Sequence, residues 1–205
     1  MSRLSDRRHR HDVYYRRAKR EEYPARSIYK LEELDRRFRL LRPGQRVLDL
    51  GCRPGSWLQY AAQRVGADGF VVGLDREALE PPLPANAAGV VGDVLSVEPE
   101  LLRRALPEPQ RSCFNVVLSD MAPDTTGIAF TDQVRSVELF VRALELALCL
   151  GCPSSSFVGK IFMGDGFDDT IRRVRERYDR VKTARPDATR KSSTEVYIVA
   201  LGRKA

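Results

Sequence analysis

Short apolar runs alternate with helical segments along most of the chain, and this alternation constrains the fold more than any other feature. Strands are predicted at Arg46–Leu50, Phe70–Leu74, a run ending at Val90–Val91, Asn115–Ser119, Ser156–Ile161, Arg180–Lys182 and Glu195–Leu201. Strands that alternate with helices build a mostly parallel sheet with helices on both faces. The last two strands have no helix between them, so we expect them to pair antiparallel. The sequence therefore predicts a Rossmann-like α/β fold: a mostly parallel, seven-stranded sheet with an antiparallel edge strand.

Apolar residues recur at helical spacing after Pro24 and again in a long segment after the fourth strand. The first helix is predicted to bury Ile28, Leu31, Leu34 and Phe38. The long helix is predicted to bury one face made of Val134, Val137, Val141, Leu144 and Leu148. Two further helices are expected over Ser56–Val65 and Phe167–Arg177.

Length and charge limit the organisation and the partners of the chain. Its 205 residues suffice for one α/β domain, which we place at residues 23–205. Residues 1–22 indicate a basic N-terminal arm, with a solvated tail as the alternative. The net charge of +7 favours a polyanionic partner, nucleic acid first. No membrane helix or secretory signal is visible, so we expect a monomeric cytoplasmic protein.

The four cysteines, Cys52, Cys113, Cys149 and Cys152, are irregularly placed. Such placement argues against a disulfide framework and for a reducing compartment. Cys149 and Cys152 form a lone C-x-x-C, but a zinc site would need two more ligands. We therefore expect structural cysteines and no metal.

The first strand leads into a glycine-containing turn and then a helix, over Val47–Trp57. Gly51 and Gly55 let the backbone turn tightly and approach a ligand closely. The turn lacks both the G-x-G-x-x-G of dinucleotide sites and the G-K-S/T of a phosphate-binding loop. It therefore suits a nucleoside that carries an uncharged or zwitterionic tail.

An aspartate also ends each of the next two strands. Asp75 is placed to accept hydrogen bonds from ribose hydroxyls, and Asp93 from an adenine amino group. Each acid alone could be an ordinary loop cap, but three such features after three successive strands favour S-adenosylmethionine over NAD.

Charged residues follow the later strands. Asp120 follows the fourth strand, and Lys160 lies near the end of a buried apolar strand, where a lysine is costly unless it is paired. A lysine that extends its amine to solvent is the alternative for Lys160. Lys30 lies on the N-terminal helix and Glu195 starts the last strand; without context, both are better interpreted as surface charges.

Together these motifs resemble the FtsJ/RrmJ family of bacterial 23S ribosomal RNA 2′-O-methyltransferases, over nearly the whole chain. The matching segments are Arg26–Leu31, Val47–Trp57, Leu118–Pro123, Lys160 after its strand, and Arg185–Tyr197. The last segment is the most specific, because it is long and unlike a generic methyltransferase. The resemblance implies a class I methyltransferase fold, S-adenosylmethionine as cofactor, and a uridine 2′-hydroxyl of 23S rRNA in the large ribosomal subunit as substrate.

The resemblance also assigns roles to residues. A catalytic Lys-Asp-Lys-Glu tetrad falls on Lys30, Asp120, Lys160 and Glu195. The cofactor contacts fall on Gly55, Trp57, Asp75, Asp93 and Asp120, beside Gly51 of the same turn. Lys160 would be the general base: burial and the nearby cation Lys30 favour a neutral amine, while Asp120 and Glu195 orient the lysines and the substrate.

Phosphate contacts are expected from the basic arm, from Arg26 and from the basic helix that carries Arg172 and Arg173. The turn departs from the family pattern, with Cys52, Arg53 and Ser56 in place of small residues. Arg53 either points outward to RNA or weakens the binding of a cationic cofactor, and Ser56 can cap its helix.

Three other functions remain to be weighed. One is a 2′-O-methyltransferase of tRNA or of an mRNA cap; the absence of an extra RNA-binding domain favours the ribosomal type instead. Another is a non-catalytic RNA-binding ribosome-assembly factor, which only Arg53 supports. An NAD-linked oxidoreductase is excluded by the glycine pattern.

Overall fold

The computed structural model describes residues 13–80, 82–108, 112–190 and 193–204. The helices are α2 (Val13–Arg20), α3 (Ile28–Phe38), α4 (Ser56–Val65), α5 (Pro99–Arg104), α6 (Ala129–Leu150) and α7 (Phe167–Arg177). The strands are β1 (Arg46–Leu50), β2 (Phe70–Asp75), β3 (Ala87–Val91), β4 (Phe114–Ser119), β5 (Gly151–Phe162), β6 (Tyr178–Ala184) and β7 (Glu195–Arg203). No helix in these ranges is long and apolar enough to cross a bilayer.

The seven strands form one sheet in the order β3-β2-β1-β4-β5-β7-β6. All neighbouring pairs from β3 to β5 are parallel, and β7 is antiparallel to both β5 and β6. The predicted mixed, mostly parallel sheet is confirmed. The antiparallel strand itself, β7, lies one position inside the edge, and β6 is the edge strand.

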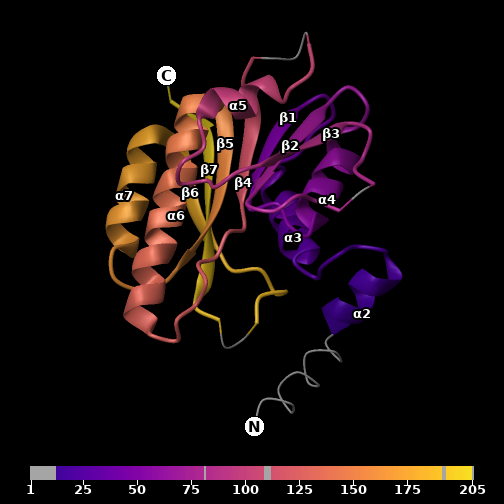
Figure 1. Cartoon of the computed structure of the whole chain (residues 1–205). Coiled ribbons are helices and arrows are strands. Elements are labelled where there is room, and N and C mark those ends of the chain that lie inside the picture. Colours follow the sequence, from indigo (N-terminus) through magenta and orange to yellow (C-terminus); the bar gives the residue numbers. More distant parts are fainter. Residues whose placement is uncertain (1–12, 81, 109–111, 191–192, 205) are drawn as a thin grey trace.

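Helices cover both faces of the sheet (Figure 1). On one face α6 and α7 pack against Leu48, Leu50 and the residues in line with them, while on the other α3 and α4 pack against Val47 and Val71. Successive strand residues point to opposite faces, so a run such as Val47-Leu48 contributes to both cores. Because all neighbouring pairs among β1 to β5 are parallel, the carboxyl ends of these strands meet at one edge, toward the lower end of the molecule in Figure 1.

The buried face of α6 agrees only in part with the predicted one. As predicted, Leu144 is buried and Val137 and Leu148 pack against the core, but Val134 is exposed. The helix also buries residues that were not predicted: Ser136, Phe140, Ala143, Ala147 and Leu150. The small alanines allow the helix to approach the sheet closely around Phe140. Two apolar stripes run along this helix, and their periodicity alone did not distinguish them.

Residues 13–22 of the basic segment form α2 and a turn that pack on α3. Ala18 of α2 is buried, and the rings of Tyr14 and Tyr29 lie 5.6 Å apart. The guanidinium of Arg17 lies 4.2 Å from the centre of the Tyr29 ring and pairs with Glu21 and Glu32. The rest of the predicted arm, residues 1–12, lies outside the described residues.

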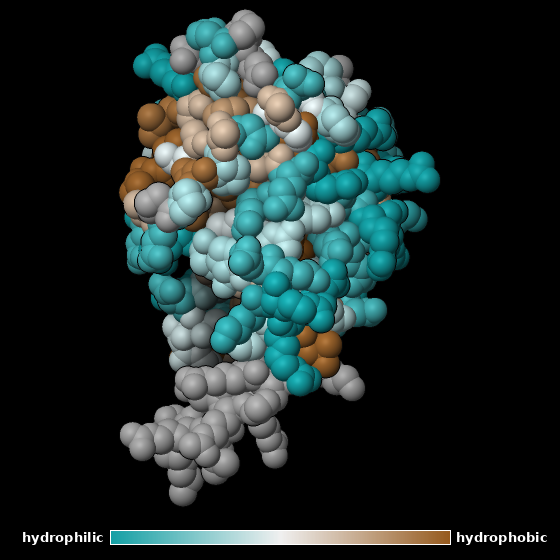
Figure 2. Space-filling model, turned by 90° about the vertical axis from the view of Figure 1, so that its right-hand side faces the viewer, coloured by the Kyte–Doolittle hydropathy of each residue, from teal (hydrophilic) through white to brown (hydrophobic). Residues whose placement is uncertain are grey.

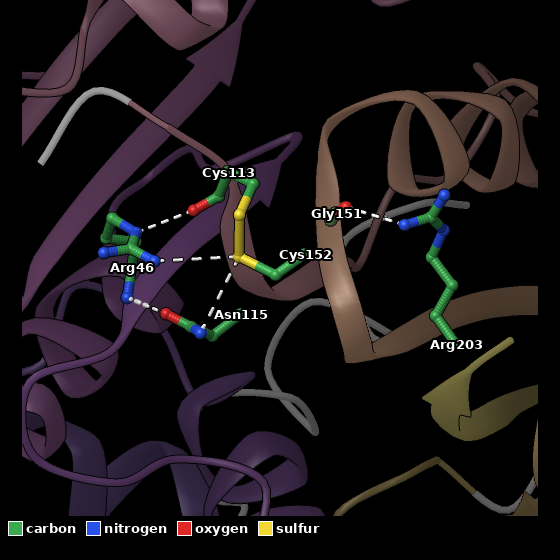
Figure 3. Close-up of a disulfide and its surroundings, with 6 residues drawn as sticks. All are labelled: Arg46, Cys113, Asn115, Gly151, Cys152 and Arg203. Atoms are coloured by element: carbon green, nitrogen blue, oxygen red, sulfur yellow. Dashed lines mark hydrogen bonds between the residues drawn. A yellow bond between two sulfur atoms is a disulfide. The ribbon is translucent and has the colours of Figure 1, made fainter. Parts of the chain in front are cut away.

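The cysteine expectation was wrong, because Cys113 and Cys152 form a disulfide (Figure 3). These residues lie at the starts of β4 and β5, which are neighbours in the sheet, and their Cα atoms are 5.0 Å apart. Arg46 donates a hydrogen bond to the Cys113 carbonyl oxygen at 2.7 Å. Cys149 of the C-x-x-C is an exposed free thiol and Cys52 a buried one. The pairing follows from strand order, which cysteine spacing does not reveal.

Candidate active site

The aspartates predicted to follow the strands meet at the carboxyl edge of the sheet. A cavity of about 440 Å³ opens there, and Gly51, Asp75, Asp93 and Asp120 are among the residues that line it. The segment Met121–Asp124 and three residues of α6, Arg135, Glu138 and Leu139, complete one wall. Four of the six predicted cofactor residues therefore lie around one cavity.

Loop amides hold Asp75 and Asp93 in place. Asp75 accepts hydrogen bonds from the backbone N–H groups of Arg53 (3.0 Å) and Glu77 (3.3 Å), and Asp93 accepts one from that of Leu95 (2.9 Å). A carboxylate offers about four acceptor positions, so both side chains can accept further hydrogen bonds from a ligand. Ribose hydroxyls and an adenine amino group donate hydrogen bonds, so two carboxylates with free acceptor positions suit such groups.

The three predicted cofactor residues in the glycine turn and the start of α4 differ in role. Gly51 has a φ of +73°, and a Cβ there would clash with the Met121 side chain, so only glycine fits. Gly55 lines a second cavity, of about 760 Å³, instead of the first. The Trp57 side chain is buried, and its indole N–H donates to the Ser27 carbonyl oxygen at 2.8 Å. Trp57 thereby joins the start of α4 to the turn of chain just before Lys30.

Two departures from the family pattern are accounted for. The Arg53 guanidinium forms an ion pair with Glu77, so its charge is countered at the cavity mouth. Ser56 does not cap its helix as expected; its Oγ accepts a hydrogen bond from the Ala25 backbone N–H at 2.7 Å. Ser56 therefore ties the segment before α3 to the first turn of α4.

The predicted tetrad is assembled as two ion pairs. Lys160 Nζ lies 2.9 Å from Asp120 Oδ1 and donates to the Asp120 backbone oxygen at 2.6 Å. Lys30 Nζ lies 2.5 Å from Glu195 Oε1. All four side chains are at most 17% exposed. Lys30 and Glu195, which resemble surface charges in the sequence, are thus recessed beside Asp120 and Lys160.

Tyr197 connects the two ion pairs and was not predicted as a site residue. Its hydroxyl donates to Asp120 Oδ1 at 2.6 Å, and its ring centre lies 5.8 Å from Lys30 Nζ. Burial, together with the charges of Asp120 and Glu195, raises the pKa of this hydroxyl. The available signal was the alternation of β7, which places Tyr197 on the same face as Glu195, two residues earlier.

Asp120 is held as an anion. Burial would raise the pKa of its carboxyl, but the charges of Lys160 and Lys30 and the hydrogen bonds from Tyr197 and Lys160 outweigh burial and lower it. The site therefore presents a fixed carboxylate between two amines and a phenol. Such a group can orient an amine that receives a proton from an attacking hydroxyl.

Asp49, on β1 just before the glycine turn, was also missed. Its side chain is buried, and among the described residues Oδ2 has no hydrogen-bond partner. Burial, with smaller contributions from the charges of Asp120 and Asp75, raises the pKa of Asp49 to about 8. Nothing in the apolar run of β1 distinguishes this residue before the fold is known.

The three predicted RNA-contacting arginines lie in different places. Arg26 donates to the Ala188 carbonyl oxygen at 2.9 Å; burial, and then the charge of Arg190, lower its pKa while Glu195 raises it. Arg26 therefore lies beside the tetrad. Arg172 and Arg173 are exposed on α7, at the β6 side of the sheet, and Arg172 pairs with Asp169 (Figure 1). Within the described ranges, no cluster of residues is suited to hold a metal ion.

The sequence of the chain is similar to those of known methyltransferases. The model of the FtsJ-like methyltransferase family matches residues 23–203. Ribosomal RNA large subunit methyltransferase E of Sorangium cellulosum is 48% identical over 196 residues, which cover 96% of this chain and 90% of the relative. The protein of the same name from Desulfatibacillum aliphaticivorans is 47% identical, covering 94% and 91%.

A solved structure shares the fold. The crystal structure of a ribosomal RNA methyltransferase from Plasmodium falciparum matches with a TM-score of 0.77 and 25% identity. The match covers 88% of this chain and 98% of that one. By sequence and by fold, the chain belongs to the FtsJ-like methyltransferase family.

Proposed function

We propose that the protein transfers a methyl group from S-adenosylmethionine to a ribose 2′-oxygen of RNA, and that this ribose belongs to a uridine of 23S rRNA in the large ribosomal subunit. The observation that carries the proposal is the pair of recessed lysine–carboxylate ion pairs beside the cavity lined by Asp75, Asp93 and Asp120. The names of the relatives support a large-subunit rRNA as the substrate.

The cavity residues fit S-adenosylmethionine. Asp75 and Asp93 offer acceptors to the ribose and the adenine, and the glycine at position 51 allows close approach of the methionine part. The Arg53 charge, which would oppose a cationic cofactor, is countered by Glu77. When bound, the cofactor supplies an electrophilic methyl group.

Lys160 is the proposed general base, because its Nζ is recessed next to the cavity and is fixed by Asp120 Oδ1 and by the Asp120 backbone oxygen. In its neutral form, after its ammonium has released a proton to solvent, Lys160 would accept the proton of the attacking 2′-hydroxyl. Lys30 and Glu195 would position the ribose, and Tyr197 keeps the Asp120 carboxylate aligned. General acid–base catalysis of this kind contributes about 10²–10⁴-fold, and alignment of the reacting atoms contributes further.

Phosphate groups of the RNA would contact Arg26 beside the tetrad and Arg172 and Arg173 on α7. The face that carries α2, α3 and α4 also presents many hydrophilic side chains (Figure 2). On α2, Arg16, Lys19 and Arg20 are exposed there. Contacts of this kind position an RNA without reading its sequence.

The test is methyl transfer from S-adenosylmethionine with a labelled methyl group to large ribosomal subunits that lack this modification. Digestion of the product to nucleosides identifies the modified atom. We expect one 2′-O-methyluridine per subunit. A label found on a base, or no label on subunits, free 23S rRNA, tRNA or capped mRNA, would reject the proposal.

A further inference from the structure

An apolar surface lies next to the candidate active site and has no role in the proposed reaction. It comprises Ile128, Phe130, Val134 and Met163, whose exposed fractions range from 48% to 62%. We call this surface the apolar rim. Ile128, Phe130 and Val134 lie within seven residues at the start of α6, and exposed apolar residues grouped in this way indicate a contact surface.

The backbone of Met163 lies close to that of the tetrad along β5, although the side chains of Met163 and Lys160 point to opposite faces of the strand. Met163 follows Lys160 by three residues, which places the two Cα atoms about 10 Å apart in an extended strand. The Met163 backbone N–H donates to the carbonyl oxygen of Thr194, the residue before Glu195. One end of the rim therefore lies within a nucleotide's reach of the proposed target ribose.

The first turns of α6 supply the rest of the rim. Phe130, Gln133 and Val134 lie on one helical face, because they are spaced by three and four residues. Gln133 packs against Gly164, so this face adjoins the turn that carries Met163. The next face of the same helix presents Arg135 to the cofactor cavity. In Figure 1 this turn of α6 lies at the lower end of the molecule, where β5 finishes.

The support of the rim is rigid. The Asp132 carboxylate accepts hydrogen bonds from the Thr126 backbone N–H (2.7 Å), the Thr126 hydroxyl (2.9 Å) and the Gly127 backbone N–H (3.3 Å). These contacts fix the loop that leads into α6 on either side of Ile128. The exposed side chains are thus presented by a helix and by a loop that hydrogen bonds hold in place, so little backbone entropy is lost on binding.

We propose that the apolar rim stacks, through Phe130, on an unpaired base that neighbours the methylated nucleotide of the substrate RNA. This inference rests on the proposed function. The tetrad is recessed, so a ribose that reaches Lys160 must leave its helical stack, and the neighbouring base loses a stacking partner. Phe130 replaces that partner, and Arg135 of the same helix offers a cation to the attached phosphates.

Steady-state methyl transfer to unmodified large subunits tests the rim. Phe130→Ala is expected to raise KM for the subunit roughly tenfold, as loss of one base–aromatic stack does. Its kcat and its affinity for S-adenosylmethionine should stay within twofold of wild type. Leu101→Ala, at another exposed apolar position, on α5, is the matched control and should leave KM unchanged. An unchanged KM in Phe130→Ala would overturn the inference.

A binding measurement separates this inference from the proposed reaction. The chain has a single tryptophan, Trp57, which is buried, so Phe130→Trp adds an exposed reporter. We expect unmodified subunits to quench its fluorescence by stacking and to leave that of Leu101→Trp unchanged. Equal fluorescence changes of the two reporters would show that no base stacks on the rim. The same conclusion would follow if wild type formed a dimer that the Phe130→Ala substitution dissociates. Absence of ribose methylation by wild type would instead reject the proposed function, and the fluorescence result would still decide the rim.

Discussion

Single hydrogen-bonding groups set the charge state of the candidate site. Tyr197 is one of them, because its hydroxyl donates to the same Asp120 oxygen that pairs with Lys160. Removing the hydroxyl leaves the packing of a fully buried ring almost unchanged. The residue is therefore suited to a test that separates positioning from folding.

Tyr197→Phe is expected to lower kcat on the order of tenfold, since a hydrogen bond to a charged group contributes about 1.5–3 kcal/mol. The lost donor also lets the pKa of Asp120 rise, because this hydrogen bond helps to keep it low against burial. The rate of methyl transfer at saturating cofactor and subunits measures this loss. An unchanged kcat would contradict the role given to Tyr197.

The raised pKa of Asp49 leads to a prediction about the free energy of unfolding. A folded-state pKa of about 8, above the value of about 3.9 in an unfolded chain, means that the folded protein retains this proton while the unfolded chain has lost it. The contribution of Asp49 to stability is therefore full below about pH 4. It declines by about 1.4 kcal/mol per pH unit as the pH rises toward 8.

Urea unfolding of wild type and Asp49→Asn at pH 5.5 and pH 8 measures this effect. Asparagine does not titrate, so the variant should gain stability relative to wild type as the pH rises. The same stability difference at both pH values would show that Asp49 is ionised in the folded protein.

At the residue scale, Lys160 and the three aspartates that line the cavity were predictable from their positions after strands. These aspartates are Asp75, Asp93 and Asp120. Lys30 and Glu195 were not predictable, because each alone is better interpreted as a surface charge; only their place in a longer motif identified them. Tyr197 and Asp49 needed the sheet, since the partner of Tyr197 is Asp120 at the end of another strand, and Asp49 is distinguished by its burial in the assembled sheet. Long-range hydrogen bonds and burial of this kind have no local signal.

At the scale of elements, the periodicity of apolar residues predicted most helices and strands. It missed α2 and α5, which are short, and it placed the buried face of α6 only in part, because Leu144 is buried but Val134 is exposed. It also gave no basis for pairing cysteines that are 39 residues apart. The disulfide joins β4 and β5 at their amino ends, the edge opposite the candidate active site.

Cys113→Ser is therefore expected to lower the free energy of unfolding by about 2–4 kcal/mol, as loss of a disulfide commonly does. Urea unfolding with and without a reductant measures this loss, and reduced wild type should match the variant. The exposed free thiol supplies the control, because Cys149→Ser should unfold as wild type does. Methyl transfer by folded Cys113→Ser should be unchanged. Equal stability of Cys113→Ser and wild type would show that the disulfide does not stabilise the sheet.

At the scale of the molecule, one sheet edge gathers side chains from α3, β4, β5 and β7. The parallel order of β1, β4 and β5 brings Asp120 and Lys160 together, and the antiparallel insertion of β7 places Glu195 and Tyr197 beside them. The alternation of strands and helices predicted the parallel part of this arrangement. It did not place β7 between β5 and β6, because strand order depends on packing between distant segments.

The most direct test of the site is the single-turnover rate of methyl transfer to unmodified large ribosomal subunits by Lys160→Ala, with the cofactor and the subunits saturating. Lys182→Ala, at an exposed lysine of the edge strand β6, is the control. We expect Lys160→Ala to react about 10²–10⁴-fold more slowly than wild type, while Lys182→Ala keeps the wild-type rate. A near wild-type rate for Lys160→Ala would contradict the assignment of Lys160 as the base that accepts the 2′-hydroxyl proton.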